Sequence, residues 1–383
     1  MLFAKIAAAL VLLVALVSSL CYSHGDQTMS REDQAQKLLA SMSSSDGPGI
    51  QYVIVNKAGV LYEHSTGLAD VKNKIPLSPS HTLPAFSMTK TLTAIAILQL
   101  AEQGKLDIDA QASDYIKHPY DRSITIRQLL NHTSGIPNPI PLRWVHLAKD
   151  HLKFDERAAL TKVLAEKPKL KNPPGKKHDY SNINYWLLGG VIEAVTGESY
   201  PMYVRTNIFQ RLRLSPNEMD FTYSESAPHA KGYLAKYSFM NVIKGFVTDK
   251  EVWGNYEGNW LSIKDVYVNG PAFGGAIGTA RAFSVILQDL LGERSVLLDD
   301  KSRELLFSRQ KTRSGKEIDM TLGWHIGNLD GTQYYYKEGG GAGFHSEMRM
   351  YPALGLASVI MTNQTSFHSR NALSELDSLF IQS

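Results

Sequence analysis

Ser87 and Lys90 are three residues apart, and an apolar segment follows them through Leu100. On a helix this spacing places both side chains on one face, where a lysine amine can activate a serine hydroxyl as a nucleophile. The apolar segment predicts a buried helix of about 17 residues, and burial lowers the pKa of a lysine. We therefore interpret Ser87 and Lys90 as a nucleophile pair; the alternative is that Ser87 is a helix cap.

The same spacing occurs once more, at Ser308 and Lys311, and must be weighed against the first copy. That segment is polar and rich in charge, with no apolar helix to desolvate the lysine. We expect Ser308 to lie on the solvated surface.

Tyr180 and Asn182 supply groups suited to the same chemistry, in a loop before the apolar run 186–195. A phenol can move protons if nearby cations lower its pKa, and an amide can both donate to and accept from a peptide-like substrate. A second Tyr-x-Asn, at Tyr267, precedes Gly-Pro and is typical of a turn. The first copy is the candidate for function.

Lys337 opens a glycine-rich run that includes Gly339 and Gly340. Glycine inside a strand often marks a place where a ligand or another backbone comes close. We expect an edge strand whose amides bind a substrate and supply an oxyanion donor, whereas the similar Lys57-x-Gly is typical of a plain turn. The alternative is a hairpin turn with an incidental lysine.

These residues need a scaffold, and strand-like runs near both ends of the chain predict one. The first pair forms a hairpin, the later runs are rich in β-branched and aromatic residues, and a helix closes the chain; the runs are 50–56, 60–64, 322–327, 333–336, 347–351 and 357–362, with the helix at 366–381. We predict an α+β fold in which both chain ends build one antiparallel sheet, flanked by helices. A helical subdomain, roughly 105–265, is inserted between them.

Composition narrows the class of protein. The 383 residues are 43% hydrophobic and 20% charged, with a formal charge of +3, which excludes disorder and coiled coil. Because no long basic run occurs, we expect a small-molecule or peptide substrate, no nucleic acid, and a monomer. The 12 histidines are scattered without a metal-ligand motif, so we expect neither metal nor cofactor.

The first 23 residues predict a secretory signal peptide. Lys5 precedes an uncharged run of 15 residues, 6–20, too short to cross a bilayer. Cleavage after Ser23 would leave one domain, 24–383, in the periplasm or outside the cell, without the only cysteine, Cys21. The alternative is an uncleaved anchor, and then the membrane is a partner only through this segment.

The three motifs, in this order, resemble those of the penicillin-recognising serine hydrolases, a family that includes class C β-lactamases, D-Ala-D-Ala carboxypeptidases, D-aminopeptidases and esterases. Residues 129–135, with His132, resemble the family's Leu-Leu-x-His-Thr-Ser-Gly turn, and 343–346 resemble the turn after its third motif. The resemblance spans roughly 50–362. It implies an acyl-enzyme reaction on an amide or ester, and gives His132 a structural role.

The resemblance also implies individual roles. Ser87 would be the acylated nucleophile and Lys90 its partner, with Tyr180 as general base or proton shuttle; which of Lys90 and Tyr180 is the base stays open. Asn182 would hold the substrate amide and position Lys90. Lys337 would lower the pKa of Lys90 and Tyr180 and attract a substrate carboxylate, and Gly339 and Gly340 would line the substrate strand. The amides of Ser87 and Gly340 would form the oxyanion hole.

One residue departs from the family pattern. Glu338 stands where β-lactamases and carboxypeptidases usually have Thr or Ser. A carboxylate there disfavours a substrate carboxylate, unless strand alternation turns Glu338 to the other face. We therefore expect an ester, or a peptide with another terminus. The non-enzyme alternative is a penicillin-binding or cell-wall-sensing module without turnover, for which a missing catalytic residue would be the sign.

Overall fold

The computed structural model describes residues 29–139 and 143–381. A six-stranded antiparallel sheet with the order β13-β14-β15-β16-β1-β2 forms its centre. The strands come from both chain ends, as predicted: β1 (Ile50–Asn56), β2 (Val60–Thr66), β13 (His325–Leu329), β14 (Thr332–Gly341), β15 (Phe344–Tyr351) and β16 (Leu356–Thr362). The α+β fold class is confirmed.

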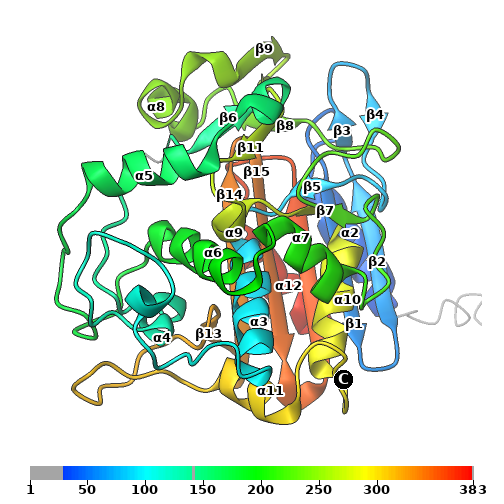
Figure 1. The fold of residues 1–383 in the computed structure, drawn as a ribbon. Coiled ribbons are helices and arrows are strands. Elements are labelled where there is room, and N and C mark those ends of the chain that lie inside the picture. Colours follow the sequence, from blue (N-terminus) through cyan, green and yellow to red (C-terminus); the bar gives the residue numbers. More distant parts are fainter. Residues whose placement is uncertain (1–28, 140–142, 382–383) are drawn as a thin grey trace, which may run out of the picture.

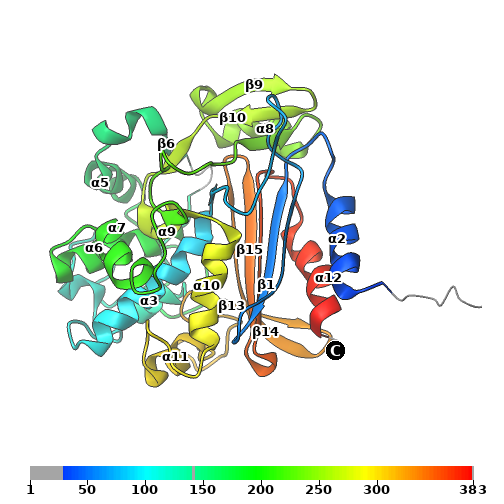
Figure 2. The ribbon, with the colours of Figure 1, turned by 90° about the vertical axis from the view of Figure 1, so that its right-hand side faces the viewer.

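Helices cover both faces of this sheet (Figures 1 and 2). One face carries α2 (Arg31–Met42) and α12 (Ser369–Ile381), and the other carries α3 (Thr89–Glu102) and α10 (Ala280–Leu291). The helix α2 lies in a segment that seemed merely polar; Ser30 caps it, and it buries Ala35 and Leu39 against the sheet. Because the segment is polar overall, its composition did not reveal the narrow apolar face of this helix.

The long middle of the chain, between β2 and β13, contains most of the remaining helices. Its helices are α4 (Ile126–Leu130), α5 (Glu156–Glu166), α6 (Asn182–Thr196), α7 (Tyr200–Val204) and α8 (Phe239–Val247), followed by α9 (Pro271–Gly274) and α11 (Asp300–Phe307). This part of the chain also contains strands that its sequence did not predict: β8 (Gly232–Ala235), β9 (Trp253–Glu257) and β10 (Trp260–Ile263) form one small sheet, and β6 (Val145–Leu147) pairs with β11 (Val266–Val268).

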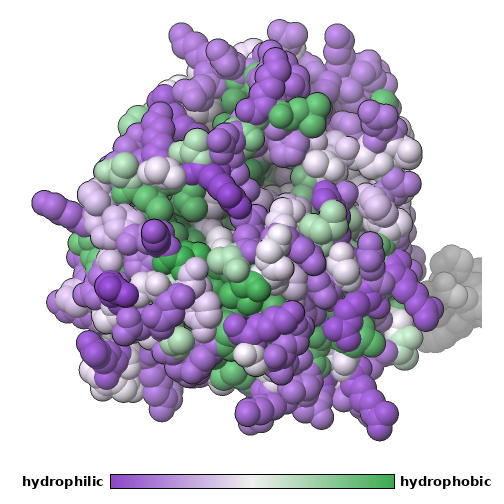
Figure 3. All heavy atoms as spheres, in the orientation of Figure 1, coloured by the Kyte–Doolittle hydropathy of each residue, from purple (hydrophilic) through white to green (hydrophobic). Residues whose placement is uncertain are grey.

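Two more small sheets complete the described strands: β3 (Leu68–Asp70) with β4 (Ile75–Pro76), and β5 (Leu83–Pro84) with β12 (Ile277–Gly278) and β7 (Met219–Asp220). The surface drawn in Figure 3 is mainly hydrophilic, with hydrophobic residues gathered in smaller patches.

The helix α3 is central to the core. Its residues from Thr89 to Leu100 are all buried, because the segment is apolar on nearly every side and packs between the sheet and α6. A single 3-10 turn, η1 (Phe86–Met88), precedes it. The predicted buried helix is thus confirmed, and it carries the Ser87–Lys90 pair at its N-terminal end.

The predicted signal segment, 1–23, lies outside the described residues. Within the described ranges, no helix combines the length and apolar character needed to cross a membrane.

Candidate active site

Ser87 and Lys90 lie where η1 runs into α3. The Lys90 Nζ is 2.9 Å from the Ser87 Oγ, so the spacing of three residues brings the two groups into hydrogen-bonding contact. Phe86, just before the serine, has a φ of 45°, a left-handed conformation that is costly for a bulky residue. The backbone is therefore strained at the residue that precedes the candidate nucleophile.

Lys90 is fully buried, and its amine contacts only neutral acceptors. Besides Ser87, the Nζ donates to the Asn182 Oδ1 at 2.7 Å and to the main-chain oxygen of Phe273, in α9, at 2.7 Å. Burial lowers the pKa of Lys90 well below its ordinary value, and the positive charge of Lys337 lowers it further. This amine is suited to accept a proton.

Sequence reasoning missed the Phe273 oxygen. A main-chain carbonyl can come from any residue type, so only the fold reveals it. Asn182, by contrast, was expected to position Lys90, and the structure brings the two together.

Tyr180 lies in the loop before α6, and its Oη donates to the Ser87 Oγ at 2.8 Å. Burial raises the pKa of Tyr180, and the nearby charge of Glu338 adds to the rise, although the hydrogen bond to Ser87 opposes it. The prediction that cations lower the pKa of this phenol is wrong, because desolvation outweighs them. Tyr180 therefore stays protonated, and Lys90 is the group better suited to accept a proton.

His132 packs behind Tyr180, with the two ring centroids 4.4 Å apart. Its Nδ1 accepts from the Ser181 amide at 3.3 Å and lies 3.2 Å from the Asn184 Nδ2. Burial holds the pKa of His132 well below its usual range, which keeps this acceptor nitrogen unprotonated. The ring thereby fixes the loop that carries Tyr180, consistent with the structural role expected for it.

Lys337 and Gly339 lie on the side of β14 that faces η1. A Cβ at position 339 would lie 2.1 Å from the main-chain oxygen of Ala85, so only glycine allows the strand to approach the serine loop. The Lys337 Nζ lies 5.1 Å from the centroid of the Tyr180 ring and has no hydrogen-bond partner among the described residues. Burial lowers the pKa of Lys337 to about 7.

The strand β14 is the second strand of the sheet, but its site-bearing half is an open edge. Pairing with β13 ends at Tyr336, opposite His325, so the stretch from Lys337 onward pairs only with β15. The two-residue turn after Gly341 makes Gly341 and Phe344 a hydrogen-bonded pair. Because antiparallel hydrogen bonding alternates, the N–H of Gly340 points to the open edge. The predicted edge character holds for this half alone.

Ser87, Tyr180, Lys337, Gly339 and Gly340 together line a cavity of about 320 Å³. Lys90 and Asn182 lie buried behind it, in contact with Ser87 and with each other. The cavity is also lined by Glu338, which the sequence marks as a departure from the family pattern, and by His325 and His345, which sequence reasoning did not assign to the site.

The competing copies of the motifs lie elsewhere. Ser308 ends α11 and donates to the Leu305 oxygen, while Lys311 lies 3.5 Å from Glu317 on the exposed surface. Tyr267 belongs to β11 rather than to a turn, and its Oη accepts from the Tyr223 amide.

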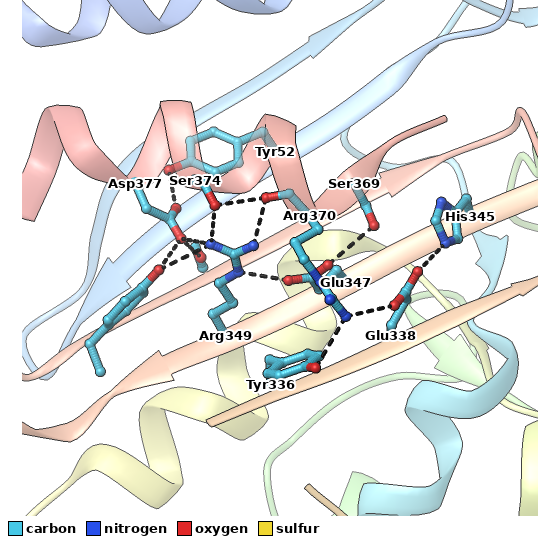
Figure 4. A network of polar contacts seen from close by, with 12 residues as sticks. Tyr52, Tyr336, Glu338, His345, Glu347, Arg349, Ser369, Arg370, Ser374 and Asp377 are labelled. Atoms are coloured by element: carbon cyan, nitrogen blue, oxygen red, sulfur yellow. Dashed lines mark hydrogen bonds and ion pairs between the residues drawn. The ribbon is translucent and has the colours of Figure 1, made fainter. Parts of the chain in front are cut away.

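The side chain of Glu338 points toward α12 (Figure 4), and because neighbouring strand residues alternate, Lys337 lies on the other face of β14. Its carboxylate accepts from the His345 Nε2 at 2.8 Å and lies 3.4 Å from the Arg370 Nη2. His345 also contacts the Phe367 oxygen through Nδ1, so both ring nitrogens donate and the ring carries a positive charge. The hydrogen bond from His345 lowers the pKa of Glu338, which is therefore ionised.

The fold and the Ser–Lys–Tyr cluster define a penicillin-recognising serine hydrolase. A family model described as Beta-lactamase matches residues 33–379, and the chain belongs to this family of serine hydrolase-type enzymes, which act on amides or esters. Protein flp of Staphylococcus aureus (strain N315) is 30% identical over 213 residues, which are 54% of this chain and 42% of that protein. The chain thus matches less than half of that relative's length.

Solved structures of low sequence identity share the fold. An octameric penicillin-binding protein homologue from Pyrococcus abyssi superposes with a TM-score of 0.74 at 20% identity, over 91% of this chain and 77% of that one. D-amino acid amidase from Ochrobactrum anthropi SV3, complexed with D-phenylalanine, also gives 0.74, at 18% identity, over 91% of this chain and 99% of that one.

Proposed function

We propose that this protein is a secreted serine hydrolase that cleaves small esters or amides through an acyl-enzyme on Ser87. The observation that carries the proposal is the position of the Ser87 Oγ, which lies 2.9 Å from the Lys90 Nζ and accepts a hydrogen bond from the Tyr180 Oη at 2.8 Å. A nucleophile between a desolvated amine and a neutral phenol has a base and an acid within reach.

The reaction would proceed in two steps. Lys90 takes the proton of the Ser87 hydroxyl as its Oγ attacks the substrate carbonyl carbon, and the N–H groups of Ser87 and Gly340 stabilise the oxyanion. Tyr180 gives its proton to the leaving atom as the carbonyl bond to that atom breaks, and the proton on Lys90 replaces it. Water then attacks the carbonyl carbon of the acyl-Ser87 ester while Lys90 takes a proton from that water. The bond between the carbonyl carbon and the Ser87 Oγ breaks, a proton passes to the Oγ, and the carboxylic acid leaves.

Glu338 bears on the substrate class through the donor that it lacks and not through charge repulsion, because its side chain is turned toward α12 and its charge is paired. A threonine hydroxyl at this position could donate to a substrate carboxylate, but the Glu338 carboxylate is an acceptor already committed to His345 and Arg370. It therefore supplies no donor at the rim of the cavity. This favours an ester or amide without a carboxylate there over a β-lactam or a D-Ala-D-Ala peptide.

Labelling with a fluorophosphonate tests the nucleophile. We expect one label per chain, located on Ser87 by peptide mass spectrometry, and loss of labelling in Ser87→Ala. Ser308→Ala is the matched control and should label normally. Labelling that persists in Ser87→Ala would refute the assignment.

Parallel assays test the substrate class and separate a hydrolase from a non-turnover module. Nitrophenyl esters should be turned over many times per chain and faster than a chromogenic cephalosporin, and Glu338→Thr should narrow that gap. A single burst without turnover on every substrate would favour the binding or sensing alternative instead. A cephalosporin preferred by a wide margin, unchanged in Glu338→Thr, would refute the substrate argument alone.

Export remains part of the proposal. It is motivated by Lys5 and the apolar run 6–20. Mass spectrometry of the mature protein should find an N-terminus near His24, whereas an intact Met1 in a cytosolic fraction would refute export.

A further inference from the structure

The helix α8 turns an apolar stripe outward. Phe239, Val242 and Phe246 follow each other at intervals of three and four residues, which places them on one face of the helix. Their exposed fractions are 74%, 81% and 60%, and Tyr237, just before the helix, is 83% exposed. Four large apolar or aromatic side chains are thus presented to solvent within ten residues.

The polar residues of the same helix face inward. Asn241 is only 3% exposed, and its Nδ2 donates to the main-chain oxygens of Ala235 and Lys236. The Lys244 Nζ donates to the Asn241 Oδ1 at 2.6 Å. A surface helix ordinarily buries its apolar stripe and exposes its polar one, so α8 has the reverse orientation. An exposed apolar patch of this kind marks an interaction surface.

The charges around the stripe are predominantly positive. Residues 236–251 contain three lysines, Lys236, Lys244 and Lys250, and two acidic residues: Asp249, which is ion-paired with Arg143 at 2.9 Å, and Glu251. The Lys236 Nζ also lies 5.6 Å from the centroid of the Tyr237 ring. Aromatic and aliphatic side chains bordered by lysines are typical of helices that lie in the interface of an anionic bilayer.

The stripe lies close to the active site. Met240 and Lys244 of α8 line a small apolar cavity together with Gly341, Ala342 and Gly343, the turn that directly follows Gly340. Figures 1 and 2 both place α8 with β9 at one end of the molecule, beyond the ends of β14 and β15. A surface bound by α8 would therefore lie near the turn that follows Gly340, a residue that lines the catalytic cavity.

We propose that α8, with Tyr237, is a docking surface for an anionic lipid bilayer. The stripe of Phe239, Val242 and Phe246 enters the boundary between headgroups and acyl chains, and the exposed Lys236 and Lys250 contact the negatively charged headgroups. This docking is independent of the reaction at Ser87 and holds whether or not the proposed hydrolysis is correct.

An environment-sensitive fluorophore can report docking at one position, because Cys21 is the only cysteine. The full chain with Cys21→Ser and Val242→Cys, labelled with nitrobenzoxadiazole, is mixed with phosphatidylcholine vesicles with or without phosphatidylglycerol. We expect a blue shift and a rise in emission that are stronger with phosphatidylglycerol. The same label at Leu354→Cys, exposed in η6 (Pro352–Leu354) beyond the opposite end of β15, should not respond.

Substitutions then separate the two contributions. Combining Phe239→Ser, Val242→Ser and Phe246→Ser should weaken the vesicle affinity of the full chain by about tenfold or more, with ester hydrolysis in solution unchanged. Lys236→Gln with Lys250→Gln should weaken binding only to vesicles that contain phosphatidylglycerol.

Three results would overturn the proposal. They are no response at position 242 with either vesicle, an equal response at position 354, and a dimer in solution that the triple substitution dissociates although vesicles cause no response. The last result would identify the stripe as an interface between copies of this chain.

Discussion

Two clusters of buried charged residues lie on opposite faces of the central sheet. In one cluster the cation is paired with carboxylates, and in the other the cations are not. Toward α12, Arg349 is fully buried with a complete set of partners, including Glu347 at 2.6 Å and the Arg370 oxygen at 2.7 Å (Figure 4). Toward α3, Lys90 contacts neutral acceptors and Lys337 has no hydrogen-bond partner among the described residues.

The acid–base behaviour of the two clusters differs accordingly. Burial opposes the charge of Arg349, but the carboxylates of Glu347 and Asp377 raise its pKa overall. Burial lowers the pKa of Lys90 and Lys337, and no carboxylate compensates fully. The paired cluster holds α12 on the sheet, whereas the unpaired one keeps amines poised to exchange protons, as functional sites require.

The largest expected effect is a loss of labelling rate when Lys90 is replaced. Lys90→Met keeps the stem but removes the base, so the second-order rate of fluorophosphonate labelling should fall by about 10⁴-fold. Because the groups left behind are neutral, the free energy of unfolding should change by less than about 2 kcal/mol. A rate loss below tenfold would show that Lys90 is not the base.

The second effect is on stability, in the other cluster. Arg349→Met leaves Glu347 and Asp377 buried without their cation, so the free energy of unfolding in urea should drop by about 3–5 kcal/mol. The labelling rate of the folded protein should stay within about twofold, because Ser87 lies on the other face of the sheet. A stable Arg349→Met would contradict the contrast between the two clusters.

The third effect tests the order of acid and base. Tyr180→Phe keeps the ring near both lysines but removes the proton that an amine or alkoxide leaving group needs, so turnover of an amide or alkyl ester should fall by about 10²-fold. Tyr267→Phe, in the other Tyr-x-Asn, is the control and should retain activity within about twofold. If Tyr180→Phe lost as much as Lys90→Met, the phenol would be the base instead.

The sequence predicted one of these clusters far better than the other. Ser87, Lys90 and Tyr180 belong to short motifs, so their grouping in one site could be predicted. The sheet built from both chain ends follows from strand-like runs, so the fold class could be predicted as well. Arg349 and Asp377 are 28 residues apart and carry no motif. Only the packing of α12 on β15 and β16 brings them together, and no local pattern records that packing.

The features of the site that depend on the packing of distant segments could not be predicted, for the same reason. The Phe273 oxygen reaches Lys90 through the fold of α9, and burial of Tyr180 depends on every segment packed around it. The reversed face of α8 could have been noticed, since Phe239, Val242 and Phe246 share helical spacing. The sequence pattern could not show that this stripe faces solvent.

The smallest expected effect follows from the unpaired charge of Lys337. Its pKa is about 7 in the fold and about 10.4 in an unfolded chain. Below pH 7 the amine is protonated in both states, and the cost of burying its charge is fully present. Between these values the unfolded chain binds more protons than the folded protein, so the free energy of unfolding rises with pH.

Lys337→Met removes that cost and should stabilise the protein more at pH 6 than at pH 9, by about 2 kcal/mol in urea unfolding. Lys311→Met, an exposed lysine beside Glu317, is the matched control and should show no such difference. An equal effect at both pH values would mean that a carboxylate or other partner neutralises Lys337 in the fold. Lys337 and Arg349 would then both be paired cations, and the two clusters would differ only in their geometry.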